Sequence, residues 1–193
     1  MGLVTRQRFA LPLIRGSSVL DIGCAGGLLL RELKNRGISV KGVEIDSASA
    51  GKCSAKGFEV VAGNIEELDV KSIGSFDTVV MTDVIEHLHD PVAALVKLKA
   101  AIKPGGRLVL TTPNVDWLFW HLYHTAGGTP HAWINPEHIQ FYNRKTIGEV
   151  LAKAGYELVG ENSYGKVPLT GIHFRSPWAF LSCNLVVAAS PKD

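Results

Sequence analysis

One short stretch of the sequence carries three side chains that can do acid–base or metal chemistry. Asp83, Glu86 and His87 form the pattern D-x-x-E-H. In a helical turn, residues three and four positions apart share one face, so two carboxylates and an imidazole would lie together. Such a group can bind a divalent cation. Its histidine can instead take a proton or orient a substrate, or the group can make structural hydrogen bonds or gate a neighbouring ligand site.

A glycine turn and a later carboxylate form a second chemical pattern. Gly23 ends an apolar run just before a helical pattern, which lets a ligand approach the backbone closely. Glu44 follows 21 residues later, where a carboxylate can bind the two hydroxyls of a ribose. The dinucleotide pattern G-x-G-x-x-G fails, because Ala25 and Leu28 take its second and third glycine positions. An NAD-type site is therefore disfavoured, and a turn that merely links a strand to a helix remains an alternative.

Five apolar runs that alternate with helical patterns must position these residues. The runs lie at residues 18–23, 39–46, 58–64, 76–83 and 107–114. Apolar strands separated by helices of about 10–15 residues indicate a parallel sheet that is buried on both faces. We predict an α/β fold with a Rossmann-like doubly wound sheet and functional loops at the carboxyl ends of the strands. Ser47 is expected to cap one helix, and Asp90 followed by Pro91 to begin another.

The alternation breaks after Asn114. Residues 115–142 contain seven aromatic residues, Trp133 among them, and four histidines. This composition suits a hinged lid over an acceptor site, or else a packing helix or a dimer interface. Strands are expected at 156–161 and 183–190, too close for a long crossover helix, so the last strand should be antiparallel. We predict one domain, residues 1–193, with a seven-stranded, mostly parallel sheet.

Composition excludes several classes of protein. The chain has 193 residues, 46% of them hydrophobic and 20% charged, which is typical of one globular domain. A net charge of +2 is too small to indicate a nucleic-acid or membrane-surface partner. No apolar run is long enough to span a bilayer, and the N-terminus lacks the apolar segment of a secretory signal. Three cysteines without CxxC spacing fit neither a disulfide framework nor a zinc ribbon, so we expect a cytoplasmic protein.

Taken together, these motifs resemble a known family. The chain is similar to class I S-adenosylmethionine-dependent methyltransferases, especially the branch of the ubiquinone-biosynthesis O-methyltransferases. The similar strings are VLDIGCAGG, GVEID, GNIEEL, FDTVVMTDVIEHLHDP and LKAAIKPGGRLVLTTPN. The resemblance covers residues 18–114 strongly and continues weakly through 137–159. It implies that the protein binds S-adenosylmethionine and releases S-adenosylhomocysteine.

The resemblance implies a role for the turn after the first strand. Asp21 would hydrogen-bond near the methionine amino group of the cofactor. Gly23, Ala25 and Gly27 would form a G-x-G-x-G turn beneath it. Ala25 departs from the usual glycine, but this cofactor has no pyrophosphate in the turn, so one methyl group can be tolerated there.

The resemblance also implies the contacts of the adenosine. Glu44 would bind the ribose diol, and Ile45 would pack on the adenine. Asn64 would meet the adenine amino group, and Ile65 would lie on the other side of the ring.

The remaining implied residues surround the methyl group. Thr82 and Asp83 would border the methionine moiety. Ubiquinone-type enzymes carry E-x-x-E-H as a metal site at the position of Asp83, Glu86 and His87. The shorter Asp83 argues against that site, and we expect no metal. His87 is then the candidate base or substrate orienter, and His138, in PEHIQFY, is a candidate acceptor-site residue.

We therefore predict an enzyme that transfers the methyl group of S-adenosylmethionine to a small-molecule or sugar acceptor. Oxygen is the expected acceptor atom, with nitrogen second, and the protein is expected to be a monomer or a homodimer. One alternative is a non-catalytic accessory protein that binds the same cofactor, and a weaker one is a NAD(P)-dependent oxidoreductase. Nucleic acid is not expected as a substrate, because the chain has no basic stripe and no D/N-P-P-Y/F motif for a flipped base.

Overall fold

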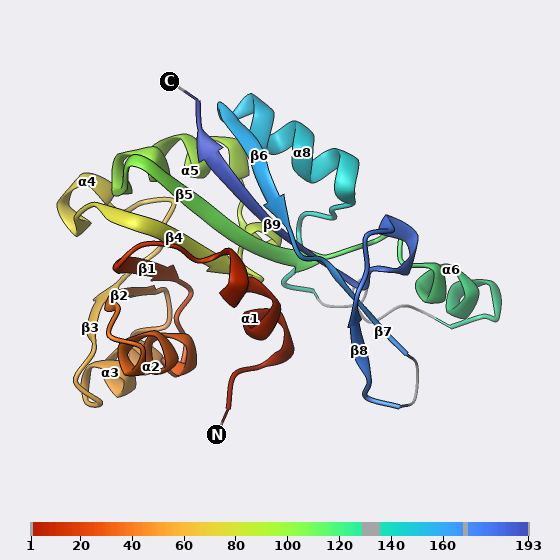
Figure 1. Ribbon diagram of the computed structural model, residues 1–193, viewed down its shortest axis with the longest axis horizontal. Coiled ribbons are helices and arrows are strands. Elements are labelled where there is room, and N and C mark those ends of the chain that lie inside the picture. Colours follow the sequence, from red (N-terminus) through yellow and green to blue (C-terminus); the bar gives the residue numbers. More distant parts are fainter. Residues whose placement is uncertain (1, 129–135, 168–169, 193) are drawn as a thin grey trace.

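Nine strands form one sheet in the computed structural model, which describes residues 2–128, 136–167 and 170–192 (Figure 1). The strands are β1 (Ser18–Ile22), β2 (Ser39–Glu44), β3 (Glu59–Ala62), β4 (Phe76–Thr82), β5 (Ile102–Pro113), β6 (Tyr156–Glu161), β7 (Tyr164–Lys166), β8 (His173–Arg175) and β9 (Asn184–Pro191). The α-helices are α1 (Thr5–Ala10), α2 (Leu28–Asn35), α3 (Ser47–Ser54), α4 (Val70–Ile73), α5 (Pro91–Leu98), α6 (Leu118–Thr125) and α8 (Arg144–Lys153). The 3-10 helices are η1 (Leu11–Leu13), η2 (Ile85–His87), η3 (Lys99–Ala101) and η4 (Ala179–Leu181). None of the described helices is long and apolar enough to cross a membrane.

The strand order confirms the predicted doubly wound α/β fold. It runs β3-β2-β1-β4-β5-β9-β7-β8, with β6 also paired to β9. The first five strands are parallel, and Asp21 on β1 lies opposite Gly42 on β2 and Val80 on β4. The order reverses between β1 and β4, and in such sheets a ligand binds at that reversal, outside the carboxyl ends of the strands.

Among the described residues the sheet has nine strands, two more than the predicted seven-stranded core. The two additional strands, β7 and β8, form a hairpin in a segment to which the sequence pattern assigns no strand. Strands of three residues carry too little periodicity to be read from a sequence. The hairpin pairs with β9 through Tyr164 and Asn184. The antiparallel pairing of β9 with β5 is as predicted.

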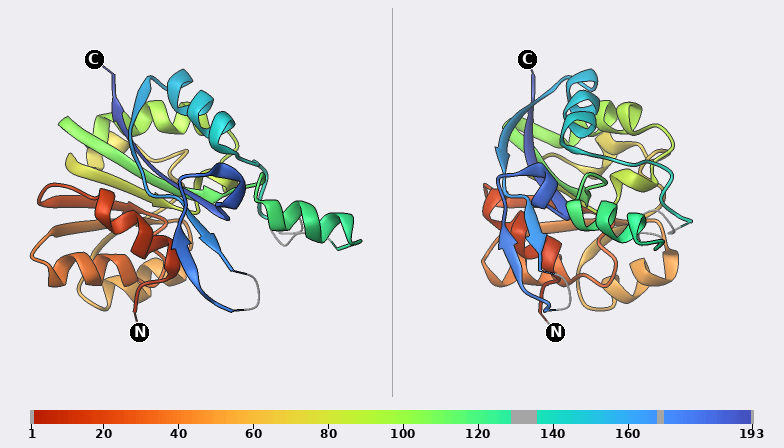
Figure 2. Two further views of the ribbon diagram at one scale, coloured as in Figure 1. Left: turned by 45° about the vertical axis from the view of Figure 1, so that its right-hand side comes forward. Right: turned by 90° about the vertical axis from the view of Figure 1, so that its right-hand side faces the viewer.

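Helices cover both faces of the sheet, with α1, α2 and α3 on one face and α4, α5 and α8 on the other (Figures 1 and 2). Successive residues of a strand point to opposite faces. Leu20 and Val79 therefore pack in the core with α5 and α8, whereas Val19 and Val80 pack in the core with α1 and α2. All four side chains are fully buried, which explains why the strands read as continuous apolar runs.

Two helix starts can be compared with their predicted caps. Asp46 caps α3 in place of the predicted Ser47, because its carboxylate accepts two backbone N–H groups of the first turn. Asp90 caps α5 as predicted, with Pro91 as the first helical residue. Both aspartates therefore fix loops that leave the carboxyl edge of the sheet.

The segment 115–142 is described in part. Its helix α6 projects from the body of the molecule (Figure 2). Trp117 is buried just before the helix, whereas Leu122 and Tyr123 on α6 are 53% and 55% exposed. Residues 129–135, including Trp133, lie outside the described residues. The interpretation of this segment as a lid stays a prediction.

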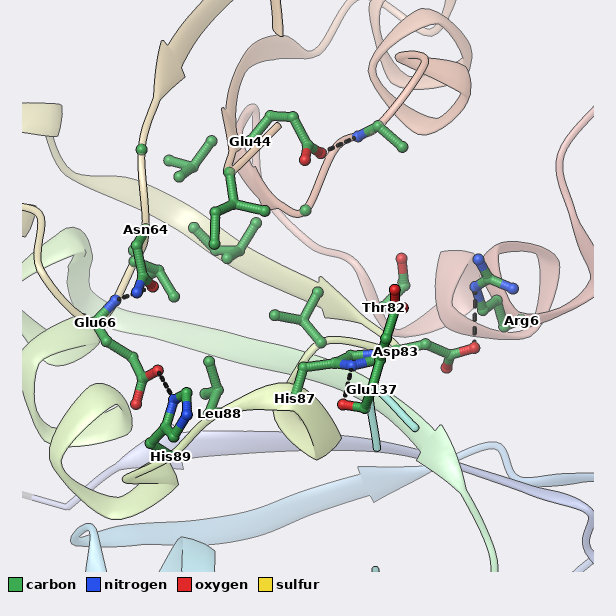
Figure 3. Close-up of a pocket in the computed structure, with 18 residues that line it drawn as sticks. Arg6, Glu44, Asn64, Glu66, Thr82, Asp83, His87, Leu88, His89 and Glu137 are labelled. Carbon is green, nitrogen blue, oxygen red and sulfur yellow. Dashed lines mark hydrogen bonds and ion pairs between the residues drawn. The ribbon is translucent and has the colours of Figure 1, made fainter. Parts of the chain in front are cut away.

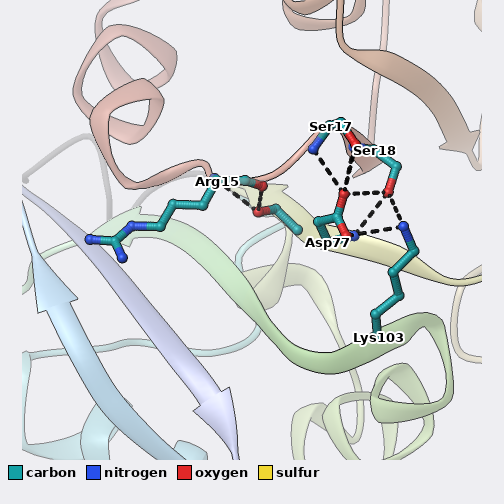
Figure 4. Close-up of polar contacts among 6 residues, drawn as sticks. Arg15, Ser17, Ser18, Asp77 and Lys103 are labelled. Carbon is teal, nitrogen blue, oxygen red and sulfur yellow. Dashed lines mark hydrogen bonds and ion pairs between the residues drawn. The ribbon is translucent and has the colours of Figure 1, made fainter.

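A polar network joins β1, β4 and β5 at their amino ends, opposite the carboxyl ends where the strand order reverses (Figure 4). Asp77, near the start of β4, accepts hydrogen bonds from the backbone N–H groups of Ser17 (2.8 Å) and Ser18 (2.9 Å). It also forms an ion pair with Lys103 of β5 at 3.0 Å. The hydrogen bond from Lys103, with those from the two serines, holds the pKa of Asp77 well below its usual range. The network stabilises the amino ends of β1, β4 and β5.

Candidate functional site

A pocket of about 530 Å³ lies at the carboxyl ends of β1 to β4, where the strand order reverses (Figure 3). Its volume is typical of sites that bind small molecules. The residues that line it come from the ends of these strands and the loops after them, from α1 and from the segment before α8. They are Arg6, Ile22, Gly23, Ala25, Val43, Glu44, Ile45, Gly63, Asn64, Ile65, Glu66, Thr82, Asp83, Val84, His87, Leu88, His89 and Glu137.

The turn after β1 forms one wall of the pocket. Its backbone takes left-handed φ values at Gly23 (+74°), Ala25 (+45°) and Gly27 (+76°). The N–H group of Gly23 donates to the Val43 carbonyl at 2.8 Å, which holds the turn against β2. A Cβ at Gly27 would lie 2.6 Å from Sγ of Cys53, so only glycine fits there. Gly23 and Ala25 line the pocket, whereas Gly27 is not among the lining residues.

Glu44 extends from the end of β2 toward this turn (Figure 3). Its Oε2 atom accepts a hydrogen bond from the N–H group of Ala25 at 2.7 Å, and its Oε1 atom accepts one from Asp46 at 3.0 Å. Glu44 is only 7% exposed, yet it lines the pocket. A carboxylate has about four acceptor positions. Each oxygen therefore keeps a position for a further donor, such as a ribose hydroxyl.

Asp21, on β1, is not among the residues that line the pocket. It is 1% exposed, and within the described residues neither of its carboxylate oxygens has a hydrogen-bond partner. Burial, and after it the neighbouring charge of Glu44, raises the pKa of Asp21 to about 8. Protonation at neutral pH avoids an unpaired buried charge. The predicted contact of Asp21 with the cofactor stays a prediction.

The turn after β3 forms another wall. Asn64 and Ile65 line the pocket there, and the side-chain oxygen of Asn64 accepts the N–H group of Glu66 at 3.0 Å. The carboxylate of Glu66 in turn accepts the N–H group of Asp90 at 2.9 Å. Ile45, after β2, is 69% exposed and offers an uncovered apolar surface on the pocket wall.

Asp83 does not share a helical face with Glu86 and His87, so that prediction is wrong. Its φ of +53° turns the chain, and η2 begins only at Ile85. The carboxylate of Asp83 forms an ion pair with Nε of Arg6 at 3.2 Å and accepts the hydroxyl of Thr111. Asp83 therefore lines the pocket with its charge already paired.

His138 lies beside Glu86 and His87, in the place predicted for Asp83. Each of these two residues and His138 offers one possible ligand atom, and the three atoms lie within 4.8 Å of one another. The rings of His87 and His138 are 4.9 Å apart between centroids. Nδ1 of His87 lies 2.8 Å from the carbonyl oxygen of Glu137, so Nδ1 is the donor, and in the neutral ring Nε2 is the nitrogen that carries a lone pair. Such a group can accept a proton or bind a cation.

Glu86 is the buried member of this group. It is 1% exposed, and within the described residues neither of its carboxylate oxygens has a hydrogen-bond partner. The hydroxyls of Thr112 and Tyr142 likewise have no hydrogen-bond partner in the part of the chain that the structure describes, and the three residues border a cavity of about 10 Å³, roughly the space of one water molecule. Burial, and after it the charge of Asp83, raises the pKa of Glu86 well above its usual range. A neutral Glu86 leaves no unpaired charge in this place.

The pocket brings together most of the residues predicted from the sequence. Eight of the ten predicted cofactor residues line it, all except Asp21 and Gly27. His87 also lines it, whereas His138 lies against His87 outside the lining. Arg6 is a lining residue that the sequence analysis missed. A single arginine ahead of the first strand carries no motif, so only the packing of α1 places it there.

The comparisons with known proteins agree on one family. The family described as a methyltransferase domain matches residues 4–161. Two curated relatives are each named ubiquinone biosynthesis O-methyltransferase. The one from Idiomarina loihiensis is 29% identical over 165 residues, which are 81% of this chain and 68% of that protein. The one from Xanthomonas oryzae pv. oryzae is 32% identical over 107 residues, which are 52% of this chain and 45% of that protein, so the match spans under half of its length.

Solved structures share the fold at lower sequence identity. A SAM-dependent methyltransferase from Thermotoga maritima, described as a possible histamine N-methyltransferase, has a TM-score of 0.76 at 20% identity and covers 97% of this chain and 88% of that one. A SAM-dependent methyltransferase from Archaeoglobus fulgidus has a TM-score of 0.74 at 23% identity, over 95% of this chain and 90% of that one. The magnesium protoporphyrin IX methyltransferase of Synechocystis, solved with bound SAH, has a TM-score of 0.67 at 17% identity, over 96% and 83%.

Proposed function

Because the chain belongs to the methyltransferase domain family, we propose that it transfers the methyl group of S-adenosylmethionine to an oxygen atom of a small-molecule or sugar acceptor. The family supplies the dependence on S-adenosylmethionine, and the class of acceptor is the proposed part. Two curated relatives named as O-methyltransferases support it. The observation that carries it is an imidazole with an available Nε2 lone pair, His87, on the wall of the pocket that holds Glu44.

The donor set of the pocket suits an adenosyl cofactor. Glu44 is proposed to bind the ribose hydroxyls with the acceptor position that remains on each oxygen. Asn64 and Ile65 are proposed to contact the adenine, with Ile45 on its other side. Arg6 lies across the pocket from Asn64 (Figure 3) and can pair with the methionine carboxylate. When bound, S-adenosylmethionine supplies a methyl group that is activated by a positively charged sulfur.

His87 is proposed to act as the base for the acceptor hydroxyl. Its hydrogen bond to the carbonyl of Glu137 fixes the tautomer, so Nε2 is the nitrogen that can accept a proton. Nε2 of His87 would accept the hydroxyl proton as the acceptor oxygen takes the methyl group that S-adenosylmethionine would supply, with S-adenosylhomocysteine as the leaving group. Holding the acceptor in line at near-attack distance supplies much of the acceleration. His138 packs edge-on against His87 and restricts the rotation of its ring.

We propose that this step uses no metal. The charge of Asp83 is already paired with Arg6. Burial raises the pKa of Glu86 and favours its neutral form, which makes Glu86 a poorer ligand than an exposed carboxylate. Divalent cations of the Mg²⁺ type bind preferentially to carboxylate and carbonyl oxygens.

The acceptor is proposed to bind between His87 and the described parts of the predicted lid, residues 115–128 and 136–142. The end of that segment already contacts the catalytic group, because the N–H groups of Ile139 and Gln140 both donate to the carbonyl oxygen of Glu86 at 3.0 Å. Glu137, in the same segment, accepts the hydrogen bond of His87. Binding of an acceptor against the segment would therefore also fix the orientation of His87.

Two measurements test the proposal in sequence. Calorimetric titration with S-adenosylhomocysteine and with NADH should show binding of the first compound alone, and preferential binding of NADH would refute the proposal. Phenols, sugars and amines are then offered with methyl-labelled S-adenosylmethionine, and the products are analysed by mass spectrometry. We expect methylated hydroxyls. Methylation of amines alone would move the acceptor to nitrogen, and cofactor binding without any transfer would favour a non-catalytic accessory protein.

A further inference from the structure

Lys97 on α5 makes an unusual set of contacts with a single turn. Its ammonium group donates to the backbone carbonyls of Glu66 (2.5 Å), Leu68 (3.2 Å) and Ile65 (3.4 Å). A lysine ammonium has three donors and no acceptor. The three hydrogen bonds use all of these donors, and all three acceptors lie in the loop between β3 and α4. Lys97 is half-buried and forms no ion pair within the described residues.

The turn that Lys97 holds lies at one side of the sheet. It follows β3, which is the edge strand of the sheet and has four residues. The N–H groups of Glu67 and Leu68 close the turn on the carbonyl of Asn64 at 2.9 and 3.0 Å. Those bonds satisfy the N–H groups of the turn but not the carbonyl oxygens of Ile65, Glu66 and Leu68. These oxygens therefore need donors from outside the turn. Lys97 supplies them from a helix that is packed in the core.

A second contact joins the turn to the start of the same helix. The carboxylate of Glu66 accepts the N–H group of Asp90 at 2.9 Å, and it lies 3.3 Å from Nδ1 of His89. Asp90 is the N-cap of α5. The contacts of Lys97 and of Asp90 therefore both connect the turn to that helix. The turn and α5 are therefore joined at two places, and the same turn carries Asn64 and Ile65 into the pocket.

We infer that Lys97 is a positioning residue for cofactor binding: it fixes the wall formed by residues 64–66 although it does not line the pocket itself. The inference rests on the proposed placement of adenine against Asn64 and Ile65. A wall that is already ordered before binding saves the ligand the entropy of ordering it. Loss of the anchor should weaken binding at the adenine end and leave methyl transfer in the loaded enzyme nearly unchanged.

The test compares Lys97→Met with Lys99→Met. Lys99 is two residues away and lies over the ring of Tyr156 at 5.3 Å, away from the turn, so it controls for the loss of a lysine from this part of the fold. We expect Lys97→Met to raise the dissociation constants of both S-adenosylhomocysteine and adenosine by about tenfold, the effect of one lost hydrogen bond to a charged group. The KM for S-adenosylmethionine should rise in parallel, with kcat within about twofold. Lys97→Arg retains the charge and the donors and should recover most of the affinity.

The outcomes separate this inference from the proposed function. Hydrogen exchange of the cofactor-free protein should quicken at the amides of residues 67–68 in Lys97→Met and not in Lys99→Met, whether or not the wild type methylates anything. Failure of the wild type to bind S-adenosylhomocysteine would refute the proposed function, and the exchange result would still stand. Unchanged affinity and unchanged exchange in Lys97→Met would overturn the inference, and so would lost affinity for S-adenosylhomocysteine with intact affinity for adenosine. If Lys97→Met does not fold, Lys97→Gln takes its place in every comparison.

Discussion

Replacement of Glu44 tests the centre of the site. Its carboxylate accepts two backbone N–H groups, from Ala25 at 2.7 Å and from Asp46 at 3.0 Å, and retains one acceptor position on each oxygen. Glu44→Ala removes all of these acceptors. Glu44→Gln keeps the size of the side chain, but its amide nitrogen must then face one of the two N–H donors. Both variants should therefore lose cofactor affinity, and Glu44→Ala should lose more.

The magnitude follows from the bonds that are lost. A hydrogen bond to a charged group contributes about 1.5–3 kcal/mol net. The two ribose hydroxyls regain water when the carboxylate is absent, so we count the net loss as one such bond. Because about 1.4 kcal/mol corresponds to a factor of ten, the dissociation constant of S-adenosylhomocysteine should rise from roughly tenfold to a hundredfold in Glu44→Ala.

Calorimetry well below the unfolding temperature measures this change without interference from stability. Stability must be followed separately, because the variant also leaves the N–H group of Ala25 without its acceptor. Glu32→Gln is the matched control, since Glu32 on α2 pairs with Arg36 and does not line the pocket. The 2′-deoxy analogue of S-adenosylhomocysteine gives the sharper comparison: wild type should bind it more weakly than the parent compound, and Glu44→Ala should not distinguish the two. Equal affinities of wild type and Glu44→Ala for S-adenosylhomocysteine would refute the ribose assignment.

Three further predictions concern the base, the metal and the fold. His87→Ala should lower kcat by about a hundredfold, as expected for loss of a general base, with little change in S-adenosylhomocysteine affinity; the reverse pattern in kinetics and calorimetry would remove His87 from the acceptor side. Dialysis against EDTA should leave turnover unchanged, and a loss restored by Mg²⁺ or Zn²⁺ would make Glu86, His87 and His138 a metal site. Asp77→Asn should lower the thermal unfolding temperature at pH 7. Since the folded pKa of Asp77 is depressed by Lys103 and the serines, its contribution is complete above the unfolded value of about 3.9 and is lost as the pH falls further, so the two proteins should converge in acid.

The fold and most of the pocket are readable from the sequence because they follow from local patterns. Each parallel strand is buried on both faces, so Val79, Val80 and their neighbours form an unbroken apolar run. In a doubly wound sheet such strands deliver their following loops to one edge. Glu44 and Asn64 therefore meet in one pocket although 20 residues separate them.

Other features depend on backbone geometry and long-range packing that no local pattern records. The grouping of Asp83 with Glu86 fails because φ at Asp83 is +53°, which breaks the helical spacing on which the grouping depends. His138 replaces it after a separation of about 50 residues, through the hydrogen bonds that residues 137–140 make to η2. Arg6 reaches the pocket only because α1 packs on the sheet.

Position 25, where alanine replaces the usual glycine, shows how the side chain of Glu44 can serve both the fold and the ligand. A left-handed φ of +45° is unfavourable for alanine, and a glycine would take it without strain. The hydrogen bond from the N–H group of Ala25 to Glu44 holds the turn in that conformation. The same carboxylate faces the pocket, so the strain at Ala25 is balanced by the residue that we assign to the ribose. A pyrophosphate would need the space beside the Ala25 backbone, whereas a ligand that contacts Glu44 by its hydroxyls does not, and this difference favours an adenosyl group over a dinucleotide.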